Sequence, residues 1–322
     1  MSQTHAIAND LHTDNEFLSD VLNGLNSSPK TLPPKYFYDA KGSQYFDDIC
    51  SLPDYYLYQT ELDLLPIVAQ DLAKHIKQQD ESGLEIVEFG AGSLRKVGML
   101  LRAIPQINHF TAIDISHEHL ISACRTLESQ YRELSITPCV HDFTKPLKLC
   151  STARTRIGFF PGSTIGNLNH REAEEFLNNA ALTLGKHSYL LIGVDTKKSE
   201  SVLQRAYNDT KGVTAKFNKN ILHRINRELD ANFSLESFGH QAFYNAEHGR
   251  VEMHLRSLKS QTVFISGEPI EFTRGESIHT ENSYKYHPPE FNQLAKRSGW
   301  STEKLWLAPQ DQFAIYLLKH RD

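Results

Sequence analysis

Short apolar runs alternate with helical patterns through most of this 322-residue chain. Five runs rich in branched or aromatic side chains each end in polar or glycine positions, as buried strands do, and they occupy residues 84–89, 110–115, 137–141, 156–160 and 188–195. After the first run, Val97, Leu100 and Ile104 recur at the spacing of one helix face. This alternation predicts a mainly parallel sheet that is covered by helices on both faces.

Segments on either side of these strands extend the prediction. Near the C-terminus, residues 304–307 and 313–318 form two strands across a short turn, which suits the antiparallel edge of the same sheet. Four N-terminal segments are expected: a short amphipathic helix at 17–25, an extended proline-bound segment at 31–35, a helix through Phe46 and Ile49, and a helix from Leu62 to about Ile76.

Residues 196–286 break the alternation. A helical stretch containing Tyr207 is followed by β-rich segments at 239–244, 250–255 and 261–265, with a hairpin turn at 247–249. We expect such an insertion at the carboxyl edge of the sheet, where ligands bind. The predicted domains are a segment at 1–61 that contributes to a substrate subdomain, a nucleotide-binding domain at 62–195 and 287–322, and an inserted α+β substrate-binding subdomain at 196–286.

The composition narrows the class of protein. With 39% hydrophobic and 23% charged residues, the chain has the balance of an ordinary globular protein. A net charge of −5 argues against nucleic acid as a partner, and no apolar run approaches the roughly 20 residues of a membrane span. The N-terminus has no signal-peptide pattern. Because the four cysteines show no C-x-x-C pairing, we expect reduced core thiols, no metal and a cytoplasmic protein.

The first predicted strand ends in a tight turn at Gly90-Ala91-Gly92. A dinucleotide-binding fingerprint would need a third glycine where the chain has Arg95, and the P-loop pattern is absent. The pattern Glu-x-Gly-x-Gly that begins at Glu88 is instead typical of methyltransferases that use S-adenosylmethionine (SAM). This cofactor carries an adenosine but no phosphate, so the third glycine matters less. A glycine turn that serves only the fold is the alternative.

Acidic residues follow the next two strands. Asp114 lies 24 positions after Gly90, near the spacing at which an acid meets the hydroxyls of a ribose; a helix N-cap is the alternative. Asp142 and Phe143 follow the third strand, where an acid and a backbone N–H can read the edge of an adenine. Aromatic residues around 36–38 and 55–56 either pack together or form a lid over a small-molecule pocket.

Six motifs, which together span nearly the whole chain, carry a resemblance. They lie at residues 32–40, 52–56, 88–96, 160–168, 206–215 and 279–286. In these motifs the chain resembles the histidine Nα-methyltransferases of ergothioneine biosynthesis, which belong to the class I methyltransferase superfamily. The resemblance implies a Rossmann-like α/β fold, a SAM cofactor and a free amino acid as the small-molecule substrate. The oligomeric state is open, with a monomer as the working expectation.

The resemblance also implies the cofactor contacts, which fall on Gly90, Lys96, Asp114, Asp142 and Phe143. Lys96 would meet the carboxylate of the cofactor as a point charge. Without the resemblance, Lys96 is interpreted as a solvated helix residue.

The implied substrate contacts fall on Tyr38, Tyr55, Gly162, Asn167, Tyr207, Met253, Glu281 and Ser283. Asn167 and Tyr207 would hold the amine and the carboxylate of the amino acid. Glu281 and Ser283 would bind the imidazole, and a substrate without that ring N–H would leave the carboxylate unpaired. Taken alone, Glu281 is interpreted as a surface charge on a β segment.

The implied reaction is trimethylation of the α-amine of histidine, the first step of ergothioneine biosynthesis. A neutral amine attacks the methyl group in line, so catalysis depends mainly on positioning. Tyr38 and Asn167 are the catalytic candidates; Asn167 cannot act as a base, and Tyr38 is expected to position groups rather than remove a proton. Asn282 stands where some relatives have an apolar residue, which leaves open another amino acid or amine, such as a tryptophan derivative. A non-catalytic protein that binds the cofactor or an amino acid is the alternative from another class.

Overall fold

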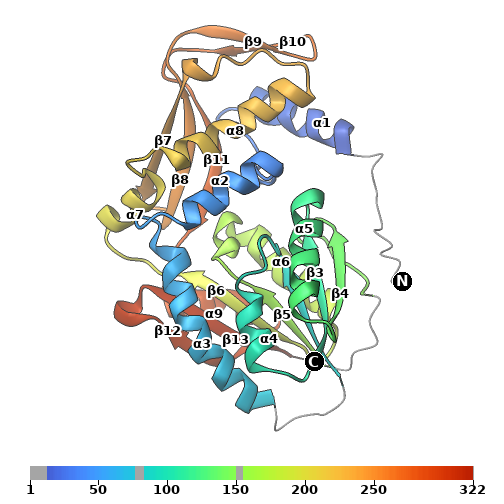
Figure 1. Ribbon diagram of the computed structural model, residues 1–322. Coiled ribbons are helices and arrows are strands. Elements are labelled where there is room, and N and C mark those ends of the chain that lie inside the picture. The colour runs from blue at the N-terminus through green and yellow to red at the C-terminus, as the bar shows by residue number, and fades with distance from the viewer. Residues whose placement is uncertain (1–12, 77–82, 150–154, 322) are drawn as a thin grey trace. The chain divides into compact units, whose positions relative to one another are not determined.

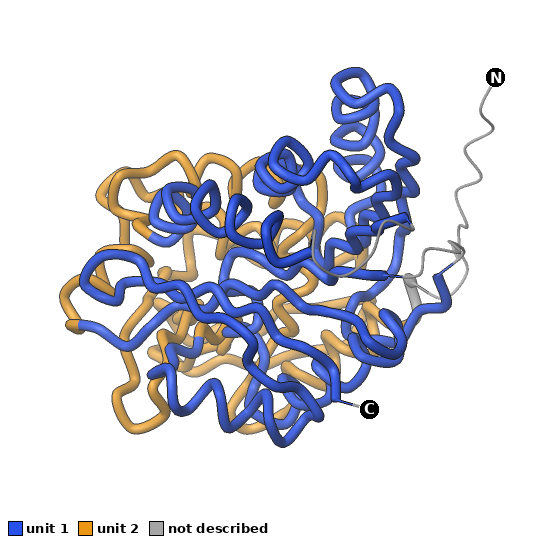
Figure 2. Tube along the Cα trace, turned by 90° about the horizontal axis from the view of Figure 1, so that it is seen from below, with its two compact units in different colours: residues 1–7, 57–198, 284–322 blue, residues 8–56, 199–283 orange. Residues whose placement is uncertain are grey.

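The computed structural model describes residues 13–76, 83–149 and 155–321. These residues form two units, each built on a β-sheet (Figure 2). Unit 1 comprises Leu57–Lys198 and Tyr284–Asp322, and unit 2 comprises Ala8–Tyr56 and Ser199–Ser283. Each unit is therefore assembled from segments that are far apart in the sequence.

Unit 1 contains a seven-stranded sheet in the order β12-β13-β6-β5-β2-β3-β4. The five strands β4, β3, β2, β5 and β6 run parallel, and β13 pairs antiparallel with both β6 and β12. Their bounds are β2 Leu84–Phe89, β3 Ile107–Asp114, β4 Ser135–Val140, β5 Thr155–Phe160, β6 Tyr189–Asp195, β12 Trp300–Leu307 and β13 Phe313–His320. The expected Rossmann-like sheet with an antiparallel edge is confirmed.

Helices cover both faces of this sheet (Figure 1). One apolar core joins the sheet to α3 (Tyr56–Ile76), α4 (Val97–Ala103) and α5 (His117–Gln130), and a second joins it to α6 (His170–Leu184) and α9 (Pro288–Arg297). The predicted start of α3 at residue 62 is wrong, because the helix begins six residues earlier, at Tyr56. The hydrophobic periodicity did not reveal the first turns of α3 because one of their buried residues is Glu61. In the sequence, a glutamate suggests a position that faces solvent.

Unit 2 contains the four-stranded sheet β1-β11-β8-β7 and a separate hairpin of β9 and β10. The bounds are β1 Lys30–Thr31, β7 Phe238–Asn245, β8 Arg250–Ser257, β9 Gln261–Ile265, β10 Glu268–Phe272 and β11 Ser277–Tyr284. Its helices are α1 Thr13–Asn26, α2 Ala40–Cys50, α7 Glu200–Tyr207 and α8 Val213–Glu228. Helix α8 packs on β7, β8 and α2 (Figure 1), and it buries Phe217, Ile221 and Ile225.

Two further details differ from the sequence-based expectation. The extended segment at 31–35 gives way to a 3-10 helix over Pro34–Phe37, because the second proline occupies a first-turn position, where no N–H is needed. Helix α8 and strands β10 and β11 were not predicted as separate elements. Cys124 is buried and Cys50 and Cys139 are half-buried, while Cys150 lies outside the described residues. No helix in the described ranges is both long and apolar enough to cross a bilayer.

Candidate functional site

The glycine turn of unit 1 joins the ends of two neighbouring strands. The backbone N–H groups of Gly90 and Ala91 both donate to the carbonyl of Ile113, at 2.9 and 3.0 Å. Gly90 has φ +69° and Gly92 φ +47°, conformations that favour glycine. A Cβ built at Gly92 would meet nothing closer than 4.0 Å, so the backbone of the turn is open to a ligand on that side.

Asp114 stands at the end of β3 and holds this turn. Its carboxylate accepts from the backbone N–H of Gly92 at 3.1 Å and of Ser116 at 2.8 Å. Burial raises the pKa of this carboxyl, although the two N–H donors oppose the shift. Ser116, not Asp114, occupies the N-cap position of α5, so the alternative interpretation of Asp114 as a helix cap is wrong.

Asp142 and Phe143 follow β4 along the same carboxyl edge. Asp142 accepts from the backbone N–H and the hydroxyl of Thr144, at 2.9 and 2.6 Å. The ring of Phe143 packs edge-on against Phe160 with centroids 5.3 Å apart, and it lies 3.5 Å from the point where Gly90 would carry a Cβ. The ring of Phe143 therefore lies beside the glycine turn, and Asp142 precedes it in the chain.

Lys96 occupies the N-cap position of α4 and is only 12% exposed, so its interpretation as a solvated residue is wrong. Its ammonium forms a 2.5 Å ion pair with Glu61 and lies 5.0 Å from the centre of the Tyr58 ring. The same carboxylate accepts from the backbone N–H of Gly162 at 2.9 and 3.0 Å. Glu61 and Tyr58 are therefore residues of this site that the sequence did not reveal.

Glu88, the first residue of the Glu-x-Gly-x-Gly pattern, is buried at the end of β2. Burial raises the pKa of its carboxyl well above the usual range. Its Oε2 has no hydrogen-bond partner among the described residues. A buried polar atom of this kind needs a partner, and together with the open glycine turn it fits a polar cofactor at this edge of the sheet.

The loop after β5 carries the two predicted substrate residues of unit 1. Gly162 has φ +79° and donates its N–H to Glu61, so a contact with a substrate would use its carbonyl. Ser163 also has positive φ and accepts from the N–H of Asp195 at 2.8 Å. Asn167 ends the 3-10 helix Thr164–Asn167 and is half-buried.

The other predicted substrate residues lie in unit 2, where several of them meet directly. The Tyr207 hydroxyl donates to Ser283 Oγ at 2.8 Å, and the rings of Tyr207 and Tyr55 meet edge-on at 6.0 Å. Burial raises the pKa of the Tyr55 phenol, with smaller contributions from neighbours that include Tyr207, Glu281 and Tyr38. Glu281 is only 8% exposed, which makes the surface-charge interpretation wrong.

Tyr38 and Met253 are the remaining predicted substrate residues of unit 2. Tyr38 packs edge-on against Phe46 and Phe217, with centroids 5.8 and 5.7 Å apart. The next residue, Asp39, caps α2 by accepting from Gly42 N at 2.7 Å and also binds residues of α8, which fixes the backbone beside Tyr38. Met253 is buried on β8, and its carbonyl accepts from Thr280 of β11.

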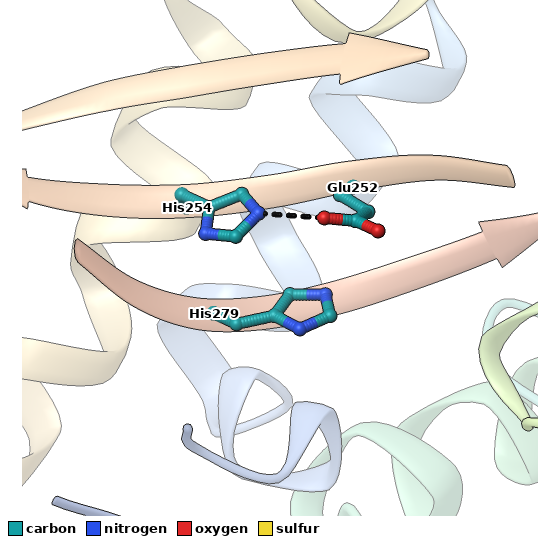
Figure 3. Close-up of side chains that lie close together, drawn as sticks. All are labelled: Glu252, His254 and His279. Atoms are coloured by element: carbon teal, nitrogen blue, oxygen red, sulfur yellow. Dashed lines mark hydrogen bonds and ion pairs between the residues drawn. The ribbon is translucent and has the colours of Figure 1, made fainter. Parts of the chain in front are cut away.

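Unit 2 also contains a group with metal-ligand chemistry, formed by Glu252, His254 and His279 on β8 and β11 (Figure 3). Several of the possible ligand atoms already have partners: Glu252 accepts from Arg250 at 2.8 Å and pairs with His254 Nε2 at 3.0 Å, and His279 Nε2 bonds the carbonyl of Glu281. The two imidazoles are stacked at 4.6 Å and 14°. Since a metal lies near the plane of each imidazole it binds, we assign no ion to this group.

Comparison with known proteins gives one consistent result. The chain is 36% identical over 304 residues to a histidine N-alpha-methyltransferase of Mycolicibacterium smegmatis, covering 92% of this chain and 93% of that protein. It is 33% identical over 320 residues to a protein of the same name from Mycobacterium tuberculosis, covering 97% and 98%. A 4-dimethylallyltryptophan N-methyltransferase of Aspergillus fumigatus is 28% identical over 324 residues, covering 94% and 93%.

The profile of one family matches almost the entire chain, from residue 17 to residue 320. The matched residues therefore include segments of both unit 1 and unit 2. The chain therefore belongs to the histidine-specific, SAM-dependent methyltransferases.

Proposed function

We propose that this protein methylates the α-amine of free L-histidine up to three times, giving Nα,Nα,Nα-trimethylhistidine (hercynine). The observation that carries the proposal is the buried carboxylate of Glu281, which lies with Ser283, Tyr207 and Tyr55 in one cluster of unit 2. A carboxylate accepts hydrogen bonds, and an imidazole N–H placed beside it would donate one.

The relatives support the same substrate. Two proteins that are 36% and 33% identical over nearly the full length carry the name histidine N-alpha-methyltransferase. One relative at 28% identity is named for a tryptophan derivative, so sequence similarity does not distinguish an imidazole from an indole substrate. The polar side chains of the unit 2 cluster provide a second argument. Imidazole has two ring nitrogens and indole only one. Glu281 and Ser283 offer two polar side chains, which favours imidazole.

In the proposed mechanism, bound SAM supplies an activated methyl group on a sulfonium. Lys96 holds the carboxylate of the cofactor, Asp114 its ribose, and Asp142 with Phe143 its adenine. The contacts of these side chains with the glycine turn, with Thr144 and with Glu61 restrict their movement before a ligand arrives. This preorganisation lowers the entropy cost of placing the reacting atoms in line.

The substrate amine must be neutral to attack, although a free α-amine is mostly protonated near neutral pH. A proton therefore has to leave the amine before each transfer. Asn167 and Tyr207 would hold the amine and the carboxylate with neutral hydrogen bonds, which place no charge beside the amine. Tyr38 acts by position, because its ring is fixed between Phe46 and Phe217. Gly162 and Met253 contribute shape rather than charge.

Mass spectrometry of products tests the proposal. Purified protein with SAM and an equimolar mixture of the twenty amino acids is expected to yield histidine carrying three methyl groups. For Glu281→Gln we expect kcat/KM for histidine to fall at least about 30-fold, since a hydrogen bond to a charged group contributes about 2 kcal/mol. The matched control is Glu268→Gln, at an exposed carboxylate of the same unit, which should leave kcat/KM unchanged.

Two results would contradict the proposal. Full activity of Glu281→Gln on histidine would remove the imidazole assignment. Methylation of a different amino acid by the unmodified protein would keep the SAM chemistry and replace the substrate.

A further inference from the structure

Glu61 is a buried carboxylate that no sequence pattern singled out, and it contacts two residues of the candidate site in unit 1. Its side chain is 1% exposed and projects from the second turn of α3. One carboxylate binds two groups with proposed roles: the Lys96 ammonium at 2.5 Å and the Gly162 N–H at 2.9 Å. These partners lie 35 and 101 positions away in the sequence.

The sheet leaves space for this carboxylate. Gly193 lies in the middle of β6, and a Cβ built there would stand 2.3 Å from Glu61 Oε1. Any other residue at this position would displace the carboxylate or the strand. A glycine inside a buried strand weakens that strand, so it usually marks a close approach by another group. Here the approaching group is Glu61.

An ion pair with Glu61 would hold the flexible Lys96 side chain in one position, where its ammonium can contact the cofactor. A lysine side chain has four rotatable bonds and loses about 2 kcal/mol of rotamer entropy when it is fixed. The ion pair with Glu61 fixes the ammonium before the cofactor binds, and the Tyr58 ring at 5.0 Å adds a favourable cation–π contact. A buried ammonium without Glu61 would also be costly to keep charged.

We propose that Glu61 is a positioning residue for the cofactor: it holds the Lys96 ammonium where the SAM carboxylate binds and fixes the backbone of Gly162 beside it. The inference deepens the proposed site and rests on the assignment of Lys96 to the cofactor. It does not depend on histidine being the substrate. Because the Glu61–Lys96 pair has no net charge, it suits the zwitterionic amino-acid end of SAM better than an isolated cation would.

Calorimetric titration of the full chain with S-adenosylhomocysteine tests the inference, with folding followed by circular dichroism. We expect Lys96→Met and Glu61→Gln each to raise the Kd about tenfold or more, the loss expected for a hydrogen bond to a charged group. Because Glu61 acts through Lys96, the double variant should bind no more weakly than Lys96→Met alone. In activity assays, Glu61→Gln should raise KM for SAM more than it lowers kcat.

Glu85→Gln is the matched control. Glu85 is also fully buried; it forms an ion pair with Arg156 at 2.9 Å and accepts a hydrogen bond from the Thr111 hydroxyl at 2.8 Å. It lies at the opposite end of β2 from the glycine turn. The control should lose stability and keep the Kd within about twofold. If Glu61→Gln does not fold, Glu61→Asp retains the charge with a side chain one methylene shorter, and it should weaken binding in the same way.

Several outcomes would overturn the inference. A Kd for Glu61→Gln or Glu61→Asp equal to that of the unmodified protein would show that the carboxylate does not position Lys96. So would effects of Glu61→Gln and Lys96→Met that add in the double variant. If Lys96→Met bound S-adenosylhomocysteine with an unchanged Kd, Lys96 would not be a cofactor contact, and the role proposed for Glu61 would fall with it. The product test for histidine methylation would not be affected by that result.

Discussion

Asp195 allows a strong prediction about stability, because it joins two lysines inside unit 1. Its carboxylate pairs with Lys285 at 2.7 Å and with Lys198 at 2.5 Å, and the side chains of Asp195 and Lys285 are both fully buried. It also accepts from the backbone N–H of Thr196 at 3.0 Å. The carboxylate therefore compensates an ammonium that has no access to water.

Replacing Asp195 with Asn keeps the shape and removes the negative charge. Breaking a buried pair on one side typically costs about 3–5 kcal/mol, because the remaining charge stays buried without compensation. Total stabilities of about 5–15 kcal/mol are usual, so this loss would be a large fraction of the whole. We expect Asp195→Asn to lower the free energy of unfolding by an amount within that range.

The pH dependence follows from the same contacts. Burial alone would raise the pKa of Asp195, but Lys285 and Lys198 lower it below the usual value. A carboxyl whose folded pKa is depressed stabilises the fold above its unfolded pKa of about 3.9, and this contribution is lost as the pH falls through the folded value. The difference between the unmodified protein and Asp195→Asn should therefore be largest at neutral pH and shrink below about pH 4.

Urea unfolding at several pH values, followed by circular dichroism, measures the effect. The control is Glu175→Gln, whose partner Arg171 is 87% exposed and which is itself 56% exposed, so the change should stay below about 0.5 kcal/mol. A loss below about 1 kcal/mol for Asp195→Asn at neutral pH would refute the reasoning. So would a loss that does not diminish in acid.

Two further predictions concern both units. Burial would raise the pKa of Glu252, but hydrogen bonds led by that of Arg250 lower it to about 2. Glu252→Gln should therefore lower the free energy of unfolding at neutral pH by about 1–3 kcal/mol, a range that allows for screening of the charge by solvent. The loss should shrink from about pH 4.5 towards pH 2, and a pH-independent loss in urea titrations would contradict this. Gly193→Ala should lower stability by about 1–3 kcal/mol and weaken S-adenosylhomocysteine binding, because the added Cβ displaces Glu61. The control Gly158→Ala, whose Cβ would meet flexible leucine methyl groups, should lower stability without weakening binding.

Local patterns were sufficient to predict most of unit 1. The strand runs that begin near residues 84 and 188 are apolar enough to be buried along their whole length, as the central strands of a parallel sheet require. The runs near residues 110, 137 and 156 also became strands, and the one near 137 forms the exposed edge. The glycine turn was visible for a related reason, since positive φ angles at Gly90 and Gly92 favour a residue without a Cβ. Such signals lie within a few residues of one another, so the sequence displays them directly.

Unit 2 was harder to predict in detail. Its strands β7 and β8 form a hairpin with a short turn and were predicted, whereas β11 pairs with β8 and with the distant β1, and no local pattern indicates either partner. The burial of Glu281 follows from that pairing and from the elements around it. A carboxylate on a strand suggests exposure until the neighbouring strands are known.

The sequence by itself determined the sheet, the glycine turn and, through six motifs, the family. Only the tertiary structure decided the environments of the charged residues: Lys96 is paired with Glu61, Asp195 joins Lys198 and Lys285, and Glu281 is buried. The physical reason is that the burial of a charge depends on partners that can lie 35 or more than 100 positions away. Spacing and periodicity report on the element to which a residue belongs, whereas its charge state and contacts depend on the elements packed around it.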